Sequence, residues 1–276
     1  MKKKKVYGVI KIALIVLACV VFLLPIYYLV INSFKPLKDI LLSFTAFPKS
    51  LTFDNYVGAA RKINYLQIFG NTLFLTVGSV LITLMFSTLA GYKLQRTHGR
   101  LSNLVRGYLS LGLMVPFAVI MVPLSQIIGR MGLNNNLAGL AFVYAAMYMP
   151  MMIFVYSGYC KNISYELDEA AIIDGCNQLQ VFVWVILPLT KPIIVTMAVL
   201  AAVWTWNDLL VALISIDDLQ LMTLTRRIQN FIGFQSGTEW DFFTAAVSLS
   251  MLPIIVLYAF LQKRVQAGLT SGAIKA

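Results

Sequence analysis

The chain has 276 residues, of which 59% are hydrophobic and 12% are charged, and its mean hydropathy is +0.81. Soluble domains carry about 45–50% apolar and about 25% charged residues, so this composition excludes a soluble enzyme, a disordered protein and a disulfide-rich secreted module. The net charge of +11 would suggest a nucleic acid partner in a soluble protein. Here the basic residues stand at the ends of apolar segments, which is typical of membrane proteins and predicts no nucleic acid partner.

Six apolar segments are long enough to cross a bilayer as helices, which takes roughly 20 residues each. Pro116 and Pro123 lie in the third segment and Pro150 in the fourth, and we expect kinks there. The sequence therefore predicts an all-α membrane protein whose six transmembrane helices form a single domain over residues 1–276. The predicted spans are residues 9–31, 72–92, 108–128, 137–156, 193–214 and 243–261.

The start of the chain has a second interpretation. Four lysines at positions 2–5 and an apolar run up to Cys19 resemble a lipoprotein signal. The apolar core of a cleaved signal has about 7–15 residues, whereas this run continues to Ile31, and Leu17 is bulky for a position so near a cleavage point. We therefore expect the first span to stay in the mature chain.

The distribution of basic residues predicts the orientation in the membrane. With the N-terminus inside, the inner segments hold 14 of the 22 Lys and Arg residues, Lys275 among them, and both termini are cytoplasmic. The two long outer loops, residues 32–71 and 215–242, have the length to touch an external partner. Solvated loops and an aromatic interface belt that includes Trp240 are the simpler interpretation.

The inner loop over residues 161–191 has strong signals for local structure. Ser164 is a candidate N-cap, and Gly175 is suited to end the helix in a left-handed conformation. Asn177 and Gln180 have the spacing of a capping box for a second helix that ends near Pro188. The sequence thus predicts a cytoplasmic helix–turn–helix. Its first turn carries the acids that complement the helix dipole, which are Glu166, Asp168 and Glu169.

One face of this helix–turn–helix is predicted to be narrow and free of bulk. Leu167, Ala171, Gly175 and Leu179 recur at intervals of four residues. Together with the small Ala170, this spacing predicts a surface that another protein approaches closely, with Glu169 as a charged contact beside it. A lipid-lying helix is the alternative, which the acidic sequence disfavours because surface helices at an anionic leaflet are usually basic.

The fifth predicted span contains Asp208, an acid that costs about 2.5–3.5 kcal/mol at the centre of a membrane. We expect Asp208 and Asn207 to face a pathway, a partner or the outer interface. Trp204 and Trp206 are candidates to stack on sugar rings, with packing or a belt position as the equal alternative.

Several of these residues together resemble the EAA loop of permeases from ATP-binding-cassette (ABC) importers, namely Glu169-Ala170-Ala171, then Gly175, then Leu187-Pro188. Further matches point to the carbohydrate group and its maltose-permease G-like subunits. These matches are Asn-Ser-Phe-Lys-Pro at 32–36, Trp-Asn-Asp at 206–208 and the tail at 268–275. The likeness runs from the first span to the C-terminus. Val185 departs from it, since the family usually has isoleucine there.

The resemblance implies a multi-pass protein of the bacterial cytoplasmic membrane that forms half of a pathway for an oligosaccharide or related polyol. It implies a heterodimer with a second permease, two cytoplasmic ATPase subunits that bind ATP and magnesium, and an extracytoplasmic solute-binding protein. The chain itself is then no enzyme and binds no cofactor or metal. The family motif assigns coupling to the ATPase to Glu169, Ala170, Ala171, Asp174, Gly175 and Pro188.

The sequence also bears on rival functions. It has no GxxxxGK[ST] phosphate loop and no HExxH motif, and its single histidine, His98, is better explained as a solvated loop residue. An ion-coupled secondary transporter is the alternative, which would need more intramembrane carboxylates or paired broken helices. A purely structural membrane partner is a third possibility, disfavoured by the ordered acidic loop.

Overall fold

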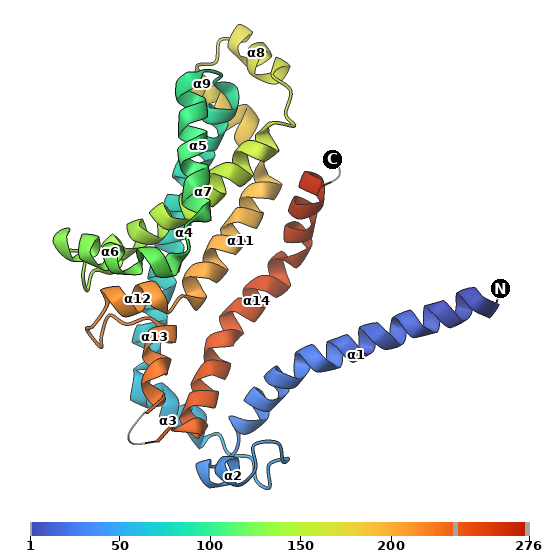
Figure 1. The fold of residues 1–276 in the computed structure, drawn as a ribbon, viewed down its shortest axis with the longest axis vertical. Coiled ribbons are helices and arrows are strands. Elements are labelled where there is room, and N and C mark those ends of the chain that lie inside the picture. Colours follow the sequence, from blue (N-terminus) through green and yellow to red (C-terminus); the bar gives the residue numbers. More distant parts are fainter. Residues whose placement is uncertain (1, 234–236, 274–276) are drawn as a thin grey trace. The chain divides into compact units, whose positions relative to one another are not determined.

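The computed structural model describes residues 2–233 and 237–273, and the regular elements of these residues are helices (Figure 1). Lys275 and the last residues of the tail matched at 268–275 lie outside the described residues. The chain divides into two compact units. Unit 1 comprises Met1–Leu66 and Arg227–Leu252, and unit 2 comprises Gln67–Arg226 and Pro253–Ala276. The prediction of an all-α protein is confirmed.

Unit 1 contains a sharp turn that follows α1 and includes the Asn-Ser-Phe-Lys-Pro sequence. The amide of Asn55 donates hydrogen bonds to the carbonyls of Ser33 and Lys35, at 2.9 and 2.8 Å. The Lys35 side chain is 1% exposed and its ammonium donates to two nearby carbonyls, and burial lowers its pKa although Asp39 opposes that shift. This motif therefore builds a buried turn. The helices of unit 1 are α1 (Lys2–Asn32), α2 (Leu37–Leu42), α3 (Asp54–Ile63), the 3₁₀ turn η2 (Gln229–Phe231) and the first part of α14 (Trp240–Ala273).

Unit 2 holds the long central helices. They are α4 (Tyr65–Arg96), α5 (Arg100–Met114), α6 (Phe117–Arg130), α7 (Leu137–Cys160) and α11 (Lys191–Asn207). Short elements connect them, namely α8 (Glu166–Ile173), α9 (Gln178–Gln180), the π-helix η1 (Val181–Ile186), α10 (Leu187–Leu189) and α12 (Leu210–Ser215), and α13 (Leu224–Ile228) lies at the boundary of the units. Figure 1 shows α8 and α9 at one end of this unit, away from α6 and α12.

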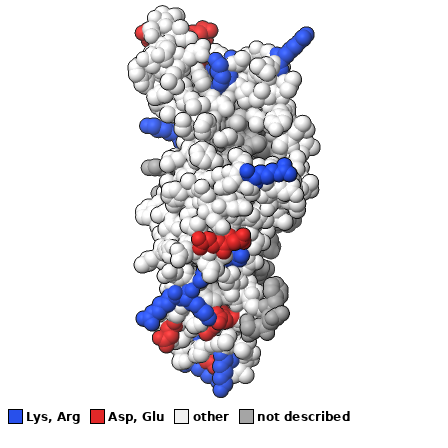
Figure 2. Space-filling view, turned by 90° about the vertical axis from the view of Figure 1, so that its left-hand side faces the viewer, with Lys and Arg blue, Asp and Glu red and all other residues white. Residues whose placement is uncertain are grey.

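Four single helices are long and apolar enough to cross a membrane, and two bent helix pairs bring the number to six if each pair is one span. The single helices are Ile10–Asn32, Tyr65–Arg96, Leu137–Cys160 and Trp240–Gln262. They match the predicted first, second, fourth and sixth spans, with ends shifted by a few residues. The chain is thus a multi-pass membrane protein, and Figure 2 shows that uncharged residues cover most of the face in view.

The predicted third and fifth spans are not straight. The third is replaced by α5 and α6, which meet at 106° because Val115 and Pro116 are extended and proline cannot continue the hydrogen bonding of α5. The fifth, predicted as 193–214, ends at Asn207, and α11 also meets the preceding helix Gln178–Leu189 at 80°. The bend expected at Pro116 is therefore present and is sharp enough to divide the third span into two helices. The expectation of one continuous fifth helix was wrong.

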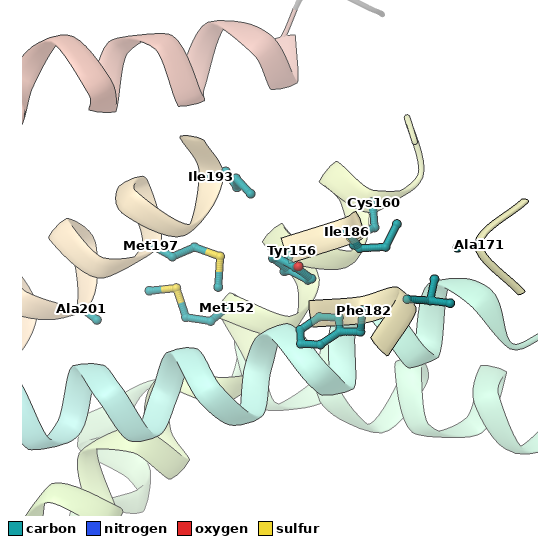
Figure 3. Packing of buried hydrophobic residues seen from close by; sticks show 10 residues of the cluster. Met152, Tyr156, Cys160, Ala171, Phe182, Ile186, Ile193, Met197 and Ala201 are labelled. Atoms are coloured by element: carbon teal, nitrogen blue, oxygen red, sulfur yellow. The ribbon is translucent and has the colours of Figure 1, made fainter. Parts of the chain in front are cut away.

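The core of unit 2 is built from α4, α7, the π-helix and α11 (Figure 3). The buried face of α4 is lined with small hydroxyl residues, and several return their hydroxyl to the preceding turn, as Thr72 does to the Ile68 carbonyl at 2.9 Å. Small side chains let helices approach closely in a membrane. A side chain on Gly91 would stand 3.1 Å from the Ile153 carbonyl and from Tyr156. The hydroxyl residues of this face are Thr72, Thr76, Ser79, Thr83, Ser87 and Thr88.

Candidate functional site

The 161–191 loop forms the predicted helix–turn–helix. Its first helix, α8, ends before Gly175, whose φ of +92° is left-handed as expected. The Cys176 N–H donates to the Ala171 carbonyl at 2.9 Å and closes the end of the helix. The predicted capping box is also present, because Asn177 and Gln180 each accept from the backbone N–H of the other, at 3.0 and 2.8 Å.

Two details of the loop differ from the sequence-based expectation. The N-cap of α8 is Tyr165 and not Ser164, although the Ser164 hydroxyl still accepts from the Glu166 N–H at 3.2 Å. The second helix continues from α9 as a six-residue π-helix, η1, before α10 reaches the exposed Pro188. π-Helical turns are rare and often mark functional sites.

The inner side of α8 packs against the chain's own core. Ala171 is 8% exposed and joins the buried cluster that contains Cys160, Phe182 and Ile186 (Figure 3). The prediction that Ala171 lies on a face open to another protein was therefore wrong. The helix has apolar residues on several sides, so a spacing of four residues does not distinguish the face that packs inward.

Asp168 also faces inward and pairs with the end of α4. Its carboxylate lies 2.6 Å from the Arg96 guanidinium and accepts a hydrogen bond from the Tyr92 hydroxyl. The same guanidinium donates to the Ile163 carbonyl at 3.1 Å and stacks over the Tyr165 ring at 4.2 Å. The loop is thus held to a helix that lies far from it in the sequence.

Two further contacts join the second helix of the loop to α4. The Lys93 ammonium donates to the Gln178 side chain at 3.0 Å, and the Tyr92 and Phe182 rings lie 5.3 Å apart. Together with the hydrogen bond from the Tyr165 hydroxyl to the Gln95 carbonyl, at 3.0 Å, they fix both halves of the loop on the last turns of α4.

The outer side of α8 carries the other predicted coupling residues. Glu169, Ala170, Asp174 and Gly175 are exposed. Ile173, which the sequence analysis did not single out, is 85% exposed. Leu167 and Ile172 of the same helix are also exposed, at 42% and 53%. A group of exposed apolar side chains, unlike a single one, marks a contact surface for a protein or a membrane. Figure 2 shows acidic groups at the end of the molecule that carries α8.

The second candidate site lies at the break between α11 and α12. The Asp208 carboxylate accepts from the Val211 and Ala212 N–H groups, at 3.0 and 3.3 Å, and from the Tyr144 hydroxyl at 2.6 Å. These donors compensate for the charge of the acid by capping α12. α12 begins at Leu210, two residues after Asp208, and the N–H groups that the carboxylate binds lie three and four residues after it.

The other candidate pathway residues lie on different sides of α11. Trp206 is 5% exposed and packs edge-on against Phe69, at 5.7 Å, so it contributes to packing. Trp204 is 37% exposed and stacks with Tyr148 at 5.3 Å, and Asn207 is exposed. Of these candidates, Trp204 and Asn207 are therefore the exposed ones, and Tyr148, which was not among the predicted residues, packs beside Trp204.

Comparisons with known proteins agree with this arrangement. Residues 83–271 match the family described as the binding-protein-dependent transport system inner membrane component. The chain belongs to this family. It is therefore a transport permease subunit of the importer type that the EAA loop indicated, and the 161–191 loop lies within the matched region.

Individual relatives cover almost the whole chain. It is 34% identical to the probable starch degradation products transport system permease protein AmyC of Thermoanaerobacterium thermosulfurigenes over 91% of both chains. It is 34% identical to the melibiose/raffinose/stachyose import permease protein MelC of Bacillus subtilis over 99% of this chain and 98% of the relative. A crystal structure of a bacterial ABC transporter for import of the acidic polysaccharide alginate has the same fold, with a TM-score of 0.84, 22% identity and coverage of 95% and 98%.

Proposed function

We propose that the chain forms half of the translocation pathway of an ATP-driven importer for an oligosaccharide or a related polyol. A second permease subunit completes the pathway, two ATPase subunits bind its cytoplasmic face, and an extracytoplasmic binding protein delivers the solute. The names of the relatives, which include transport proteins for starch degradation products and for melibiose, raffinose and stachyose, support this substrate class. Both termini lie in the cytoplasm in this proposal, as the distribution of Lys and Arg predicts.

The observation that carries the proposal is the two-sided construction of α8. Asp168 and Ala171 hold the helix to its own chain, while Glu169, Ala170 and Asp174 are presented outward. A helix that only connected two spans would not need the group of exposed apolar residues that Leu167, Ile172 and Ile173 form beside these acids. In the proposed complex, this exposed side docks on an ATPase subunit.

Transport requires that the docked helix makes different contacts in two states of the ATPase pair, because only differential contacts shift an equilibrium. Closure of the ATPase pair then moves α8, and the helices that hold it change between inward-facing and outward-facing arrangements. Gly175 bears on this step because a side chain at its left-handed φ costs about 1–2 kcal/mol.

The test uses the complete complex of both permeases, the ATPase and the binding protein in proteoliposomes. Glu169→Lys and Gly175→Val are expected to lower solute uptake by about tenfold or more, with ATP hydrolysis no longer stimulated by the loaded binding protein. Gly158→Val is the matched control for added bulk, because Gly158 has open space around it on α7. Lys161→Glu is the control for charge reversal at an exposed position in the turn that precedes α8.

Normal uptake and normal assembly in both Glu169→Lys and Gly175→Val would overturn the coupling assignment. Transport by the lone chain under an ion gradient, without an ATPase, would instead support the secondary transporter. The ligand retained by the cognate binding protein identifies the solute class, and a ligand that is no carbohydrate or polyol would overturn that part of the proposal.

A further inference from the structure

We propose that the Arg96–Asp168 pair connects the 161–191 loop to α4, so that a movement of α8 displaces α4 as well as the helices covalently joined to the loop. We call this the α4-link proposal. Arg96 and Asp168 act as positioning residues in this proposal, which rests on the proposed coupling function. Neither residue belongs to the family motif that assigned the coupling residues.

The geometry of the Arg96 guanidinium supports a rigid connection. Its ion pair with Asp168, at 2.6 Å, joins two side chains that are only 10% and 11% exposed. It donates to the Ile163 carbonyl at 3.1 Å and to the Ser164 carbonyl at 3.4 Å. One planar guanidinium thus binds both the residues just before α8 and Asp168 in the first turn of the helix. A lysine ammonium lacks the fixed donor directions of this planar group.

The aromatic residues around this pair limit its freedom further. The Tyr165 ring lies 4.2 Å from the guanidinium carbon, and the Tyr165 hydroxyl donates to the Gln95 carbonyl. The Tyr92 hydroxyl donates to the second oxygen of Asp168. Both carboxylate oxygens are therefore engaged by α4, and α8 cannot rotate about its axis without breaking contacts to α4.

Asp168 stands next to Glu169 in the sequence, so a displacement at the exposed Glu169 passes directly to the buried ion pair. Successive residues of an α-helix are rotated by about 100°, so Glu169 is exposed while Asp168 is buried. A force applied by a partner at Glu169 reaches Arg96 through one peptide unit and one ion pair. From Arg96 it acts on a 32-residue helix whose buried hydroxyl face packs inside unit 2.

Attachment of the loop did not require this pair. α8 is joined to α7 through a short turn at residues 161–165 and is anchored in the core by Ala171. The Arg96–Asp168 ion pair and the Tyr92–Asp168 hydrogen bond, which spans 76 positions, add a link to α4. A merely structural clamp would leave coupling unchanged when this link is weakened. This difference makes the proposal testable.

The experiment uses the full complex in proteoliposomes and measures solute uptake per ATP hydrolysed. Asp168→Asn and Arg96→Met are each expected to lower this ratio by about fivefold or more, while the complex still assembles. The double variant is expected to be no worse than the more severe single variant, because both remove the same link. Arg96→Lys keeps the charge without the planar group and should recover part of the ratio.

Arg100→Met is the matched control, since Arg100 is exposed at the first position of α5, and its ratio should equal that of the parent. Tyr92→Phe removes one hydroxyl and keeps the ring next to Phe182, so it retains the fold and should lower the ratio by about twofold. If Arg96→Met does not assemble, Tyr92→Phe and Asp168→Asn decide the question.

The α4-link proposal would be overturned if Asp168→Asn and Tyr92→Phe leave the uptake per ATP hydrolysed unchanged and lower uptake only in proportion to the amount of complex. The proposed function would survive that result, because the parent complex would still couple uptake to ATP hydrolysis. Failure of the parent complex to transport would count against the proposed function itself.

Discussion

The 161–191 loop and the break between α11 and α12 each centre on an aspartate, buried in the first and partly buried in the second, and they compensate for its charge in different ways. Asp168 meets the guanidinium of Arg96 and the hydroxyl of Tyr92. Asp208 meets the first N–H groups of α12 and the hydroxyl of Tyr144. The contacts of Asp168 join elements that lie far apart in the sequence. The backbone contacts of Asp208 bind N–H groups only three and four residues away, at the start of α12.

This difference indicates what each site is suited to do. An ion pair between two elements transmits a displacement from one to the other, whereas a helix cap fixes where a short helix starts. In both regions a residue adjacent to the aspartate in the sequence is exposed. This residue is Glu169, which follows Asp168, and Asn207, which precedes Asp208. The outward residues are therefore the candidates for contact with partners or solute, and the inward aspartates hold them in place.

The largest effect on stability is expected at the α11–α12 break. Asp208→Ala removes a cap, worth about 1 kcal/mol, and leaves the buried Tyr144 hydroxyl without its partner, at about 1–3 kcal/mol. The free energy of unfolding should fall by about 2–4 kcal/mol, measured by thermal unfolding in detergent. Asp208→Asn is the control, since asparagine also caps helices. Unchanged stability combined with altered solute preference would show that Asp208 acts in the pathway instead.

A matched pair of tyrosine variants compares the two sites directly. Tyr144→Phe and Tyr92→Phe each remove one hydrogen bond to a carboxylate, worth about 1.5–3 kcal/mol. We expect Tyr144→Phe to cost about 2 kcal/mol and Tyr92→Phe about 1 kcal/mol, because Asp168 keeps its ion pair with Arg96. Chemical unfolding of both variants measures the difference. Equal losses would mean that the ion pair does not compensate for the lost hydroxyl.

The smallest effect is expected from the capping box within the loop. Asn177→Ala removes the acceptor of the Gln180 N–H and should cost about 1 kcal/mol of local stability. Amide hydrogen exchange at residues 178–182 should then accelerate by about fivefold, with little change in overall unfolding. Asn162→Ala, at an exposed position before α8, is the control. Unchanged exchange would show that packing of Phe182 alone starts this helix.

The sequence predicted those features that depend on neighbouring residues. Long apolar runs identified the four unbroken spans, and Gly175 and Asn177 identified the turn and the second helix of the loop. These signals act within one or two helical turns, so they need no knowledge of the rest of the fold.

The features that the sequence did not predict depend on tertiary contacts. Hydropathy over 108–128 is the same whether the chain is straight or bent by 106° at Pro116. The inward direction of Ala171 depends on the core formed by Met152, Tyr156 and Phe182. The pairing of Arg96 with Asp168 joins residues that no periodicity relates. The roles of the exposed residues stay predictions that the transport experiments test.

The separation of Tyr92 and Asp168 by 76 positions also has a consequence for biosynthesis. At about 5–20 residues per second, the ribosome makes Asp168 roughly 4–15 seconds after the end of α4. During that interval Arg96 has not yet met its carboxylate, and a guanidinium at a helix end extends toward water and holds that end at the membrane surface. The same side chain that later fixes the loop thus first anchors a newly made helix, and the order of synthesis separates the two roles in time.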